Sequence, residues 1–115
     1  MEAVNRSVAI VVPKEPYLEW MRKDDETGIA DDVFRNMHED PHAFLLPEYV
    51  DDEEKEAMLE HFSPLIFESI LDGWLRDSLM WPKKRDYKMF KEWFEVRICS
   101  VVDDLFVSQP LLHED

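Results

Sequence analysis

Apolar residues gather along the chain in two kinds of segment: short continuous runs rich in β-branched side chains, and longer stretches where they recur every three or four positions. The run Ser7–Val12 stops at Pro13 and predicts a strand, because proline lacks the N–H that a sheet ladder needs. His42–Leu46, which stops at Pro47, predicts a second strand. The long β-branched run Glu95–Val107 predicts a third.

Two helices are predicted between the first two strands. Pro16 suits a first helical turn, where its missing N–H costs nothing, and the apolar side chains after it predict a short helix that ends near Lys23. A second helix of one or two turns is predicted over residues 33–37, with Asp31 or Asp32 as its N-cap. The acidic stretch between the two helices is typical of a solvated loop.

A long apolar stripe and then an aromatic one predict the helices before the third strand. Glutamates occupy the start of the stripe over residues 53–73, where the helix dipole favours negative charge. Ser63 followed by Pro64 predicts a kink or a restart within it, because Pro64 cannot donate a hydrogen bond to the preceding turn. After a turn, Asp86 is the expected N-cap of a helix whose aromatic residues recur at the helical period.

The order of these elements predicts an α+β or small α/β fold: a single two-layer domain with about three strands and helices packed on the sheet. Because helices connect the strands, the sheet is expected to be at least partly parallel. The 115 residues suit one domain over positions 1–115. Its ends, residues 1–6 and 108–115, are predicted to be frayed.

Composition and charge narrow the class of function. The 27 Asp and Glu against 13 Lys and Arg give a net charge of −14, so direct binding to nucleic acid or to a membrane surface is not expected. The longest apolar run, Val8–Val12, is far shorter than the roughly twenty residues of a membrane span, and no signal peptide is expected. The single cysteine, Cys99, is predicted to be buried and unreactive, which favours a cytoplasmic protein.

Three short sequence islands stand out from the rest of the chain. They are VVPKEPYLEW (Val11–Trp20), LLPEY (Leu45–Tyr49) and MWPKKRDYKMFKEWF (Met80–Phe94), the last of which continues to SVVDDL (Ser100–Leu105). In these islands the chain resembles a group of small uncharacterised bacterial proteins. The resemblance implies a bacterial origin and the same fold class, and it assigns no activity and no site residue.

The pentapeptide HEDPH, which begins at His38, matches the HExxH pattern of zinc hydrolases. Pro41 disfavours a helix across this pattern and His42 begins a predicted strand, so the two histidines are not expected to share a helix face. Because the pattern matches but its helical context does not, a metal-dependent hydrolase that uses His38, Glu39 and His42 is an alternative hypothesis and not the leading one. No cofactor is predicted, because the chain has only two glycines and no phosphate-binding loop.

Charged residues follow the ends of the predicted strands. In a parallel sheet, the carboxyl ends of the strands would bring Lys14, Glu48, Asp103 and Asp104 to one rim, which is where open α/β sheets bind ligands. Such a rim could hold a metal ion or a cationic group, and it is a second form of the hydrolase hypothesis. Charged residues beyond strand ends are also an ordinary feature of a solvated surface.

The cations are concentrated in one short segment, which we call the basic strip. Residues 83–91 have a local net charge of +4, which leaves −18 on the rest of a chain whose net charge is −14. The strip favours contact with an acidic partner or with a second copy of the chain, or it is a solvated helix face. The cations of the basic strip are Lys83, Lys84, Arg85, Lys88 and Lys91.

The leading functional hypothesis is a non-enzymatic protein–protein interaction or regulatory module, because neither a catalytic nucleophile with its base nor a cofactor motif is evident. Its partner would be another protein or a second copy of this chain. The alternatives are the metal-dependent hydrolase and an inhibitor that imitates nucleic acid, in which the acidic remainder of the surface would occupy a basic groove on another protein.

Overall fold

The computed structural model describes residues 2–114 of the chain. None of the helices in this part, including the 23-residue α3, combines the length and the hydrophobicity needed to cross a lipid bilayer. The elements, in chain order, are β1 (Glu2–Ala3), β2 (Ser7–Pro13), α1 (Glu15–Lys23), α2 (Ala30–Glu39), β3 (His42–Leu46), α3 (Asp52–Trp74), the 3-10 helix η1 (Ser78–Met80), α4 (Tyr87–Trp93), β4 (Phe94–Cys99) and β5 (Asp103–Asp104).

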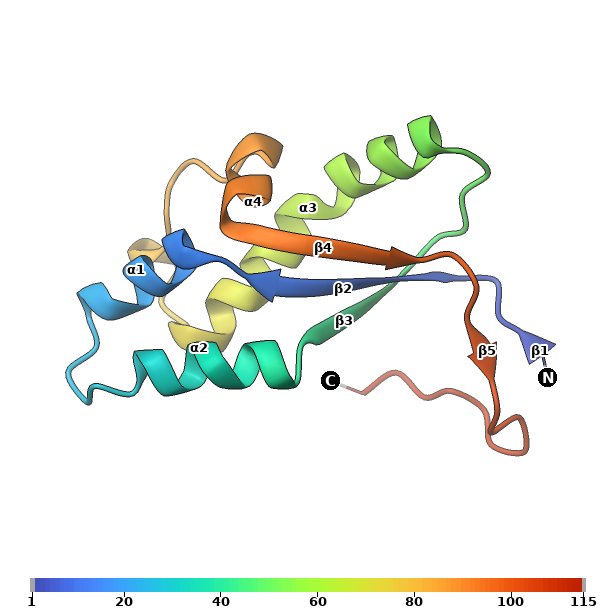
Figure 1. The fold of residues 1–115 in the computed structure, drawn as a ribbon, viewed down its shortest axis with the longest axis horizontal. Coiled ribbons are helices and arrows are strands. Elements are labelled where there is room, and N and C mark those ends of the chain that lie inside the picture. The colour runs from blue at the N-terminus through green and yellow to red at the C-terminus, as the bar shows by residue number, and fades with distance from the viewer. Residues whose placement is uncertain (1, 115) are drawn as a thin grey trace.

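The central sheet is antiparallel, with strand order β3-β2-β4 (Figure 1). Ala9 of β2 lies opposite Phe44 of β3 on one side and Ile98 of β4 on the other. The predicted α+β fold with three strands and packed helices is confirmed, but the expected parallel pairing is wrong. After the connection through α3 and α4, the strand β4 runs parallel to β3, but the two strands are not neighbours. The strand β2 lies between them and is antiparallel to both.

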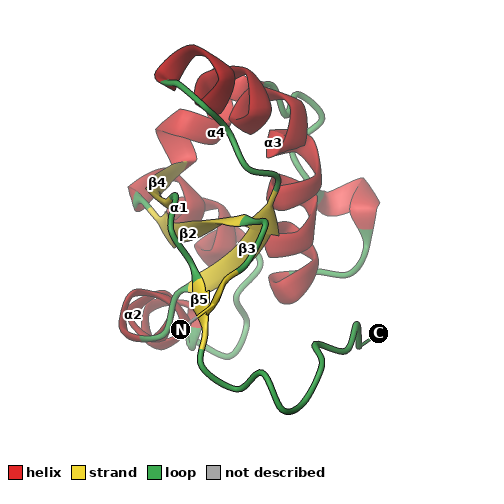
Figure 2. Cartoon of the chain, turned by 90° about the vertical axis from the view of Figure 1, so that its right-hand side faces the viewer, coloured by secondary structure: helices red, strands yellow, loops and turns green. Residues whose placement is uncertain are grey.

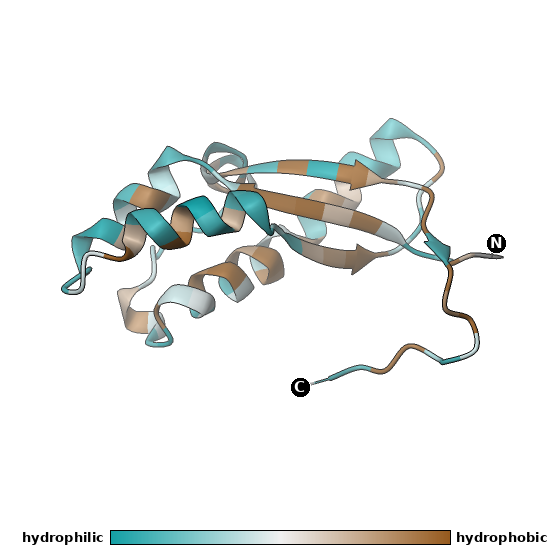
Figure 3. Cartoon of the chain, turned by 60° about the horizontal axis from the view of Figure 1, so that its bottom comes forward, coloured by the Kyte–Doolittle hydropathy of each residue, from teal (hydrophilic) through white to brown (hydrophobic). Residues whose placement is uncertain are grey.

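The helices share one core with the sheet, because Ala30 of α2 belongs to the same buried cluster as residues of α1, α3 and α4. Figure 2 shows α4 and α3 at the top and right of the strands and α2 at the lower left. The alternating residues Ser7, Ala9 and Val11 of β2 are buried, and their cross-strand neighbours on β3 and β4 continue this face into the core. In the hydropathy view all three strands carry brown apolar positions, and β4 also carries polar ones (Figure 3).

An aromatic cluster joins three helices to the sheet. The ring of Phe67 on α3 is fully buried and lies 5.2 Å from that of Phe94, 5.4 Å from Trp93 and 6.0 Å from Phe90. Tyr17 of α1 packs on the other side of Phe94, with ring centroids 5.5 Å apart. Because α4 continues directly into β4, these contacts fix α1 and α3 against the α4–β4 junction.

The helix α3 is continuous through Pro64, so the predicted restart of the helix is wrong. Pro64 has no N–H to donate to the carbonyl of Glu60 one turn earlier. The hydroxyl of Ser63, which is buried, donates to that carbonyl instead, with an oxygen–oxygen distance of 2.9 Å. The side chain of Ser63 thereby supplies the hydrogen bond that the backbone cannot make.

The helix α2 is longer than the predicted 33–37 and is capped differently. The carboxylate of Asp25 accepts hydrogen bonds from three successive backbone N–H groups, those of residues 28–30, at 2.8–3.3 Å. These bonds satisfy donors at the start of the helix, and the expected caps Asp31 and Asp32 instead form surface ion pairs with arginines. The backbone N–H bonds, above all that of residue 30, hold the pKa of Asp25 below its usual value.

The last long strand is shorter than predicted. β4 ends at Cys99, not at Val107, and Cys99 is exposed, so its predicted burial is wrong. The chain then forms β5, which pairs with β1 through Glu2 and Asp104. Part of the N-terminal end that was expected to be frayed is therefore in a strand pair, and positions 1 and 115 lie outside the described residues.

We predict that Ser63→Ala lowers the free energy of unfolding by about 0.5–1.5 kcal/mol, because it removes the hydrogen bond to the carbonyl of Glu60. In the Pro64→Ala background the new N–H at position 64 can donate to that carbonyl. There, Ser63→Ala should lower the free energy of unfolding by much less. Urea unfolding of the wild type, both single variants and the double variant measures the difference. An equal cost of Ser63→Ala in both backgrounds would contradict this role.

Candidate functional site

The basic strip is divided into side chains that hold the fold and side chains that face solvent. The guanidinium of Arg85 bonds to the carboxylate of Glu68 on α3 at 3.0 Å and lies over the ring of Trp81 at 5.7 Å. The ammonium of Lys91 lies 3.8 Å from a carboxylate oxygen of Glu56, also on α3. Arg85 is partly buried and helps to fasten the segment before β4 to α3, whereas Lys91 is itself exposed and forms only a surface ion pair.

The remaining three lysines of the strip, Lys83, Lys84 and Lys88, are exposed. Lys84 lies 3.4 Å from the carboxylate of Asp86, while Lys83 and Lys88 have no carboxylate within ion-pair distance among residues 2–114. Asp86 is the N-cap of α4, as predicted, and accepts the backbone N–H of Met89 at 2.9 Å. That hydrogen bond, with smaller contributions from the two lysine ammonium groups, holds the pKa of Asp86 below its usual value.

An open cleft of about 520 Å³, which we call the Trp cleft, lies beside the basic strip. One wall comes from α1 and the other from the segment between η1 and the end of α4. Its volume is within the range of about 300–1,000 Å³ that is typical of binding pockets. The residues that line it are Pro16, Glu19, Trp20, Lys23, Asp24, Met80, Trp81, Pro82, Met89 and Trp93.

Indole hydrogen bonds hold the walls of the Trp cleft in place. The N–H of Trp20 donates to the carbonyl of Met80 at 3.3 Å, and the N–H of Trp81 donates to the carbonyl of Leu75 at 2.6 Å. Trp93 also lines the cleft and lies 6.3 Å from Trp20 between ring centroids. The polar ends of Trp20 and Trp81 are thus used by the fold, and the partly exposed rings of Trp81 and Trp93 line the cleft beside the buried Trp20.

The exposed lysines are next to residues of the Trp cleft in sequence. Lys83 directly follows Pro82 of the wall, and Lys88 directly precedes Met89, while the charged side chains that line the cleft itself are Glu19, Lys23 and Asp24. Sequence reasoning identified the lysines but missed the cleft. One signal was present in LMWP, residues 79–82, where methionine, tryptophan and proline follow one another.

The predicted strand-end rim does not form, because β2 runs against both of its neighbours. Lys14 lies at the end of the sheet where β4 begins, and Glu48, Asp103 and Asp104 follow strands that end at the opposite end. The ammonium of Lys14 instead donates to the carbonyl of Lys91 at 2.9 Å, in the last turn of α4. Lys14 therefore lies beside the basic strip.

The histidines of HEDPH belong to different elements. α2 ends at Glu39, one residue after His38, and His42 begins β3. The ring of His38 packs on Phe34 of its own helix, at 4.7 Å between ring centroids, and that of His42 stacks on Phe44 at 4.1 Å. Among residues 2–114, no group of three or more His, Cys, Asp or Glu side chains lies close enough together to hold a metal ion.

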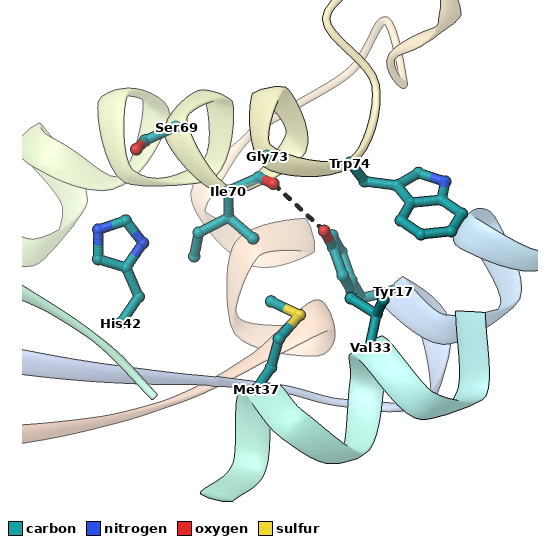
Figure 4. A pocket seen from close by; sticks show the side chains of 8 residues that line it. All are labelled: Tyr17, Val33, Met37, His42, Ser69, Ile70, Gly73 and Trp74. Atoms are coloured by element: carbon teal, nitrogen blue, oxygen red, sulfur yellow. Dashed lines mark hydrogen bonds between the residues drawn. The ribbon is translucent and has the colours of Figure 1, made fainter. Parts of the chain in front are cut away.

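A second pocket, of about 220 Å³, lies where α1, α2 and α3 meet near His42 (Figure 4). Burial raises the pKa of Tyr17, and its hydroxyl donates to the carbonyl of Ile70 at 3.2 Å. Partial burial lowers the pKa of His42, which stands at the opposite end of the pocket from Trp74. The pocket is smaller than typical ligand sites, and its middle is apolar, so we interpret it as a packing gap between helices.

Comparison of the chain with protein-family models, with curated proteins and with solved structures found no match. The resemblance to small bacterial proteins therefore stays a prediction. What the structure establishes is a small α+β domain with an open Trp cleft, two of whose lining residues, Pro82 and Met89, are next to exposed lysines in sequence.

We predict that Asp86→Ala lowers the melting temperature at neutral pH, because the start of α4 loses its cap. The folded-state pKa of Asp86 is lowered, so its contribution is present above the usual pKa of aspartate and is lost as the pH falls through the folded-state value. The difference in melting temperature between wild type and variant should therefore stay constant from about pH 7 to about pH 5 and shrink as the pH falls below the usual aspartate pKa of about 3.9. A difference that stays constant down to about pH 2 would show that the charged carboxylate does not act as the cap.

Proposed function

We propose that this protein is a non-enzymatic interaction module that binds an acidic segment of a partner protein at the Trp cleft and the basic strip. The observation that carries the proposal is the pairing of an open aromatic cleft with the exposed lysines Lys83, Lys84 and Lys88. The proposal takes up the hypothesis that the basic strip is a contact surface, and it adds the cleft as the place for an apolar anchor.

The chemistry of the surface suits protein recognition. Tryptophan and methionine are enriched in the cores of protein interfaces, where a few such residues supply most of the binding energy. Here Trp20, Trp81 and Trp93 are already held in place by the fold, so a partner would lose little conformational entropy from this side when it binds.

Charge defines which partners fit. The exposed lysines attract carboxylates, and the net charge of −18 on the rest of the chain repels polyphosphates such as nucleic acids at longer range. Protein segments that combine Asp or Glu with a large apolar side chain satisfy both parts of the surface. Raising the salt concentration should weaken their binding, because the ion pairs at the rim remain exposed to solvent.

A display library of random twelve-residue peptides, selected on the wild-type protein, tests this proposal. We expect the selected peptides to share an excess of Asp and Glu next to an aromatic or large aliphatic residue. The variant with Lys83→Glu and Lys88→Glu should bind them at least about tenfold more weakly, because two attractive contacts become repulsive.

The matched control carries Arg6→Glu and Arg35→Glu, which change the net charge by the same amount at exposed positions outside the strip and the cleft. The control should bind the selected peptides almost as well as the wild type. If both double variants lose binding equally, overall charge and not the basic strip explains it. If the selected peptides show no acidic excess, the proposal is wrong.

A further inference from the structure

Residues 105–112, which we call the strap, differ from the rest of the chain in charge and exposure. Their sequence, LFVSQPLL, contains no charged residue, although 35% of the whole chain is charged. The large apolar side chains of the strap are all between 56% and 75% exposed. They are Leu105, Phe106, Val107, Leu111 and Leu112. Exposed apolar patches mark contact surfaces, so the strap is expected to have a surface to dock on.

An open groove of about 260 Å³, which we call the β3 groove, lies between β3 and α3. Its rim is exposed to solvent, because Leu45 of β3 and Leu65 of α3 are 52% and 65% exposed. The residues that line it are all apolar: Phe44, Leu45, Leu46, Phe62, Leu65 and Ile66. The β3 groove therefore matches the strap in both hydrophobicity and lack of charge.

The strand beside this groove is an edge of the sheet. In the order β3-β2-β4, only one side of β3 is paired within the described residues. Its sequence, HAFLL, has no lysine, glutamate or proline of the kind that prevents another segment from pairing with an edge strand. Natural proteins commonly cover such an edge with a helix or a loop. The edge and the groove thus form one surface that calls for a cover.

The strap starts at the end of the sheet where β3 ends. Ser7 of β2 pairs with Leu46, the last residue of β3. The backbone N–H of Val4, three residues before Ser7, donates to the carbonyl of Val102 at 2.8 Å, shortly before the strap begins. Figures 1 and 3 show the chain after β5 turning back along the molecule, below β3 in both views. The strap therefore leads back along the molecule in the direction opposite to β3.

We propose that the strap closes over the β3 groove of its own chain, with Leu111 and Leu112 as its anchors in the groove. The structure presents the open form. Leu111 is seven residues beyond Asp104, the last residue of β5. Seven extended residues span about 23 Å, which exceeds the length of about 17 Å that the five residues of β3 cover. The chain is thus long enough to carry the anchors along the whole of β3.

Charge and tethering favour the groove of the same chain over that of a second copy. The net charge of −14 makes two copies repel each other, whereas the strap and the residues that line the groove carry no charge. A short tether also gives the strap an effective concentration on the order of millimolar at its own groove. Closing withdraws apolar side chains of both surfaces from water, and the strap has no charged side chain whose ion pair would have to break.

The closed strap acts as a gate. It keeps other extended segments away from the edge of β3 and from the groove, and its opening makes both accessible. This inference goes beyond the proposed function and does not rest on it, because the residues that line the β3 groove and those that line the Trp cleft are different.

Solution NMR of the full chain with labelled leucine methyl groups tests the closed form. We expect nuclear Overhauser effects between the methyl groups of Leu111 or Leu112 and the ring of Phe62 or the methyl groups of Leu65. They should persist when the protein is diluted, because the contact lies within one chain. Their absence would contradict the proposal. Their loss on dilution would also contradict it, since it would place the contact between copies.

A fluorescein-labelled peptide with the sequence of residues 105–114 tests the competition that a gate implies. The full-length variant with Leu111→Ser and Leu112→Ser lacks the anchors, so its groove is free. It should bind the peptide at least about tenfold more tightly than the wild type, whose own strap competes. Adding Leu65→Asp to this variant should abolish the binding, because it places a charge on the rim of the groove. Leu65 is exposed, and circular dichroism confirms that each variant is folded.

The matched control carries Ile29→Ser and Leu79→Ser, which replace two exposed apolar residues outside the strap and the groove. It should bind the peptide as weakly as the wild type does. Equal binding by the wild type and the strap variant would overturn the proposal, and so would binding that survives Leu65→Asp. Adding Lys83→Glu and Lys88→Glu to the strap variant should leave the binding unchanged. Loss of binding there would place the peptide at the basic strip and overturn the strap, while the proposed function would stand.

Discussion

The packing of aromatic rings around the α4–β4 junction is the constraint on which the rest of this structure depends. Phe90, Trp93 and Phe94 follow one another through the end of a helix and the start of a strand, and Phe67 of α3 contacts all three. Tyr17 brings α1 to the same cluster. Because Trp93 also lines the Trp cleft, the contacts that stabilise the fold help to set the position of the candidate site.

Local signals in the sequence predicted the elements well where a proline or a cap marks a boundary. The strand before Pro47 has the expected limits, and the helix after Asp86 begins where predicted. Strand direction could not be predicted in this way, because the two helices between β2 and β3 form a reversing pair and return the chain antiparallel. Continuity at Pro64 depends on the buried hydroxyl of Ser63, which a local reading of Ser-Pro interprets as a cap.

For the candidate site, too, the sequence revealed the local features but not those that depend on tertiary packing. Charge patterning revealed the basic strip, but it could not show that Arg85 and Lys91 pair with carboxylates of α3, since those partners lie 17 and 35 residues earlier in the chain. The Trp cleft depends on two segments far apart in sequence that only tertiary packing brings together. The assembled surface is therefore visible only in the structure, whereas its components look like ordinary core and solvated residues in the sequence.

Native-state hydrogen exchange tests the central claim most directly, namely that the aromatic cluster makes α4 part of the same cooperative unit as the sheet. The amides of Phe90 and Phe94, which bond within α4 and at its end, should exchange with the same opening free energy as the amides of the central strand β2. Exchange of the α4 amides through a separate opening of lower free energy, with β2 still protected, would contradict the account.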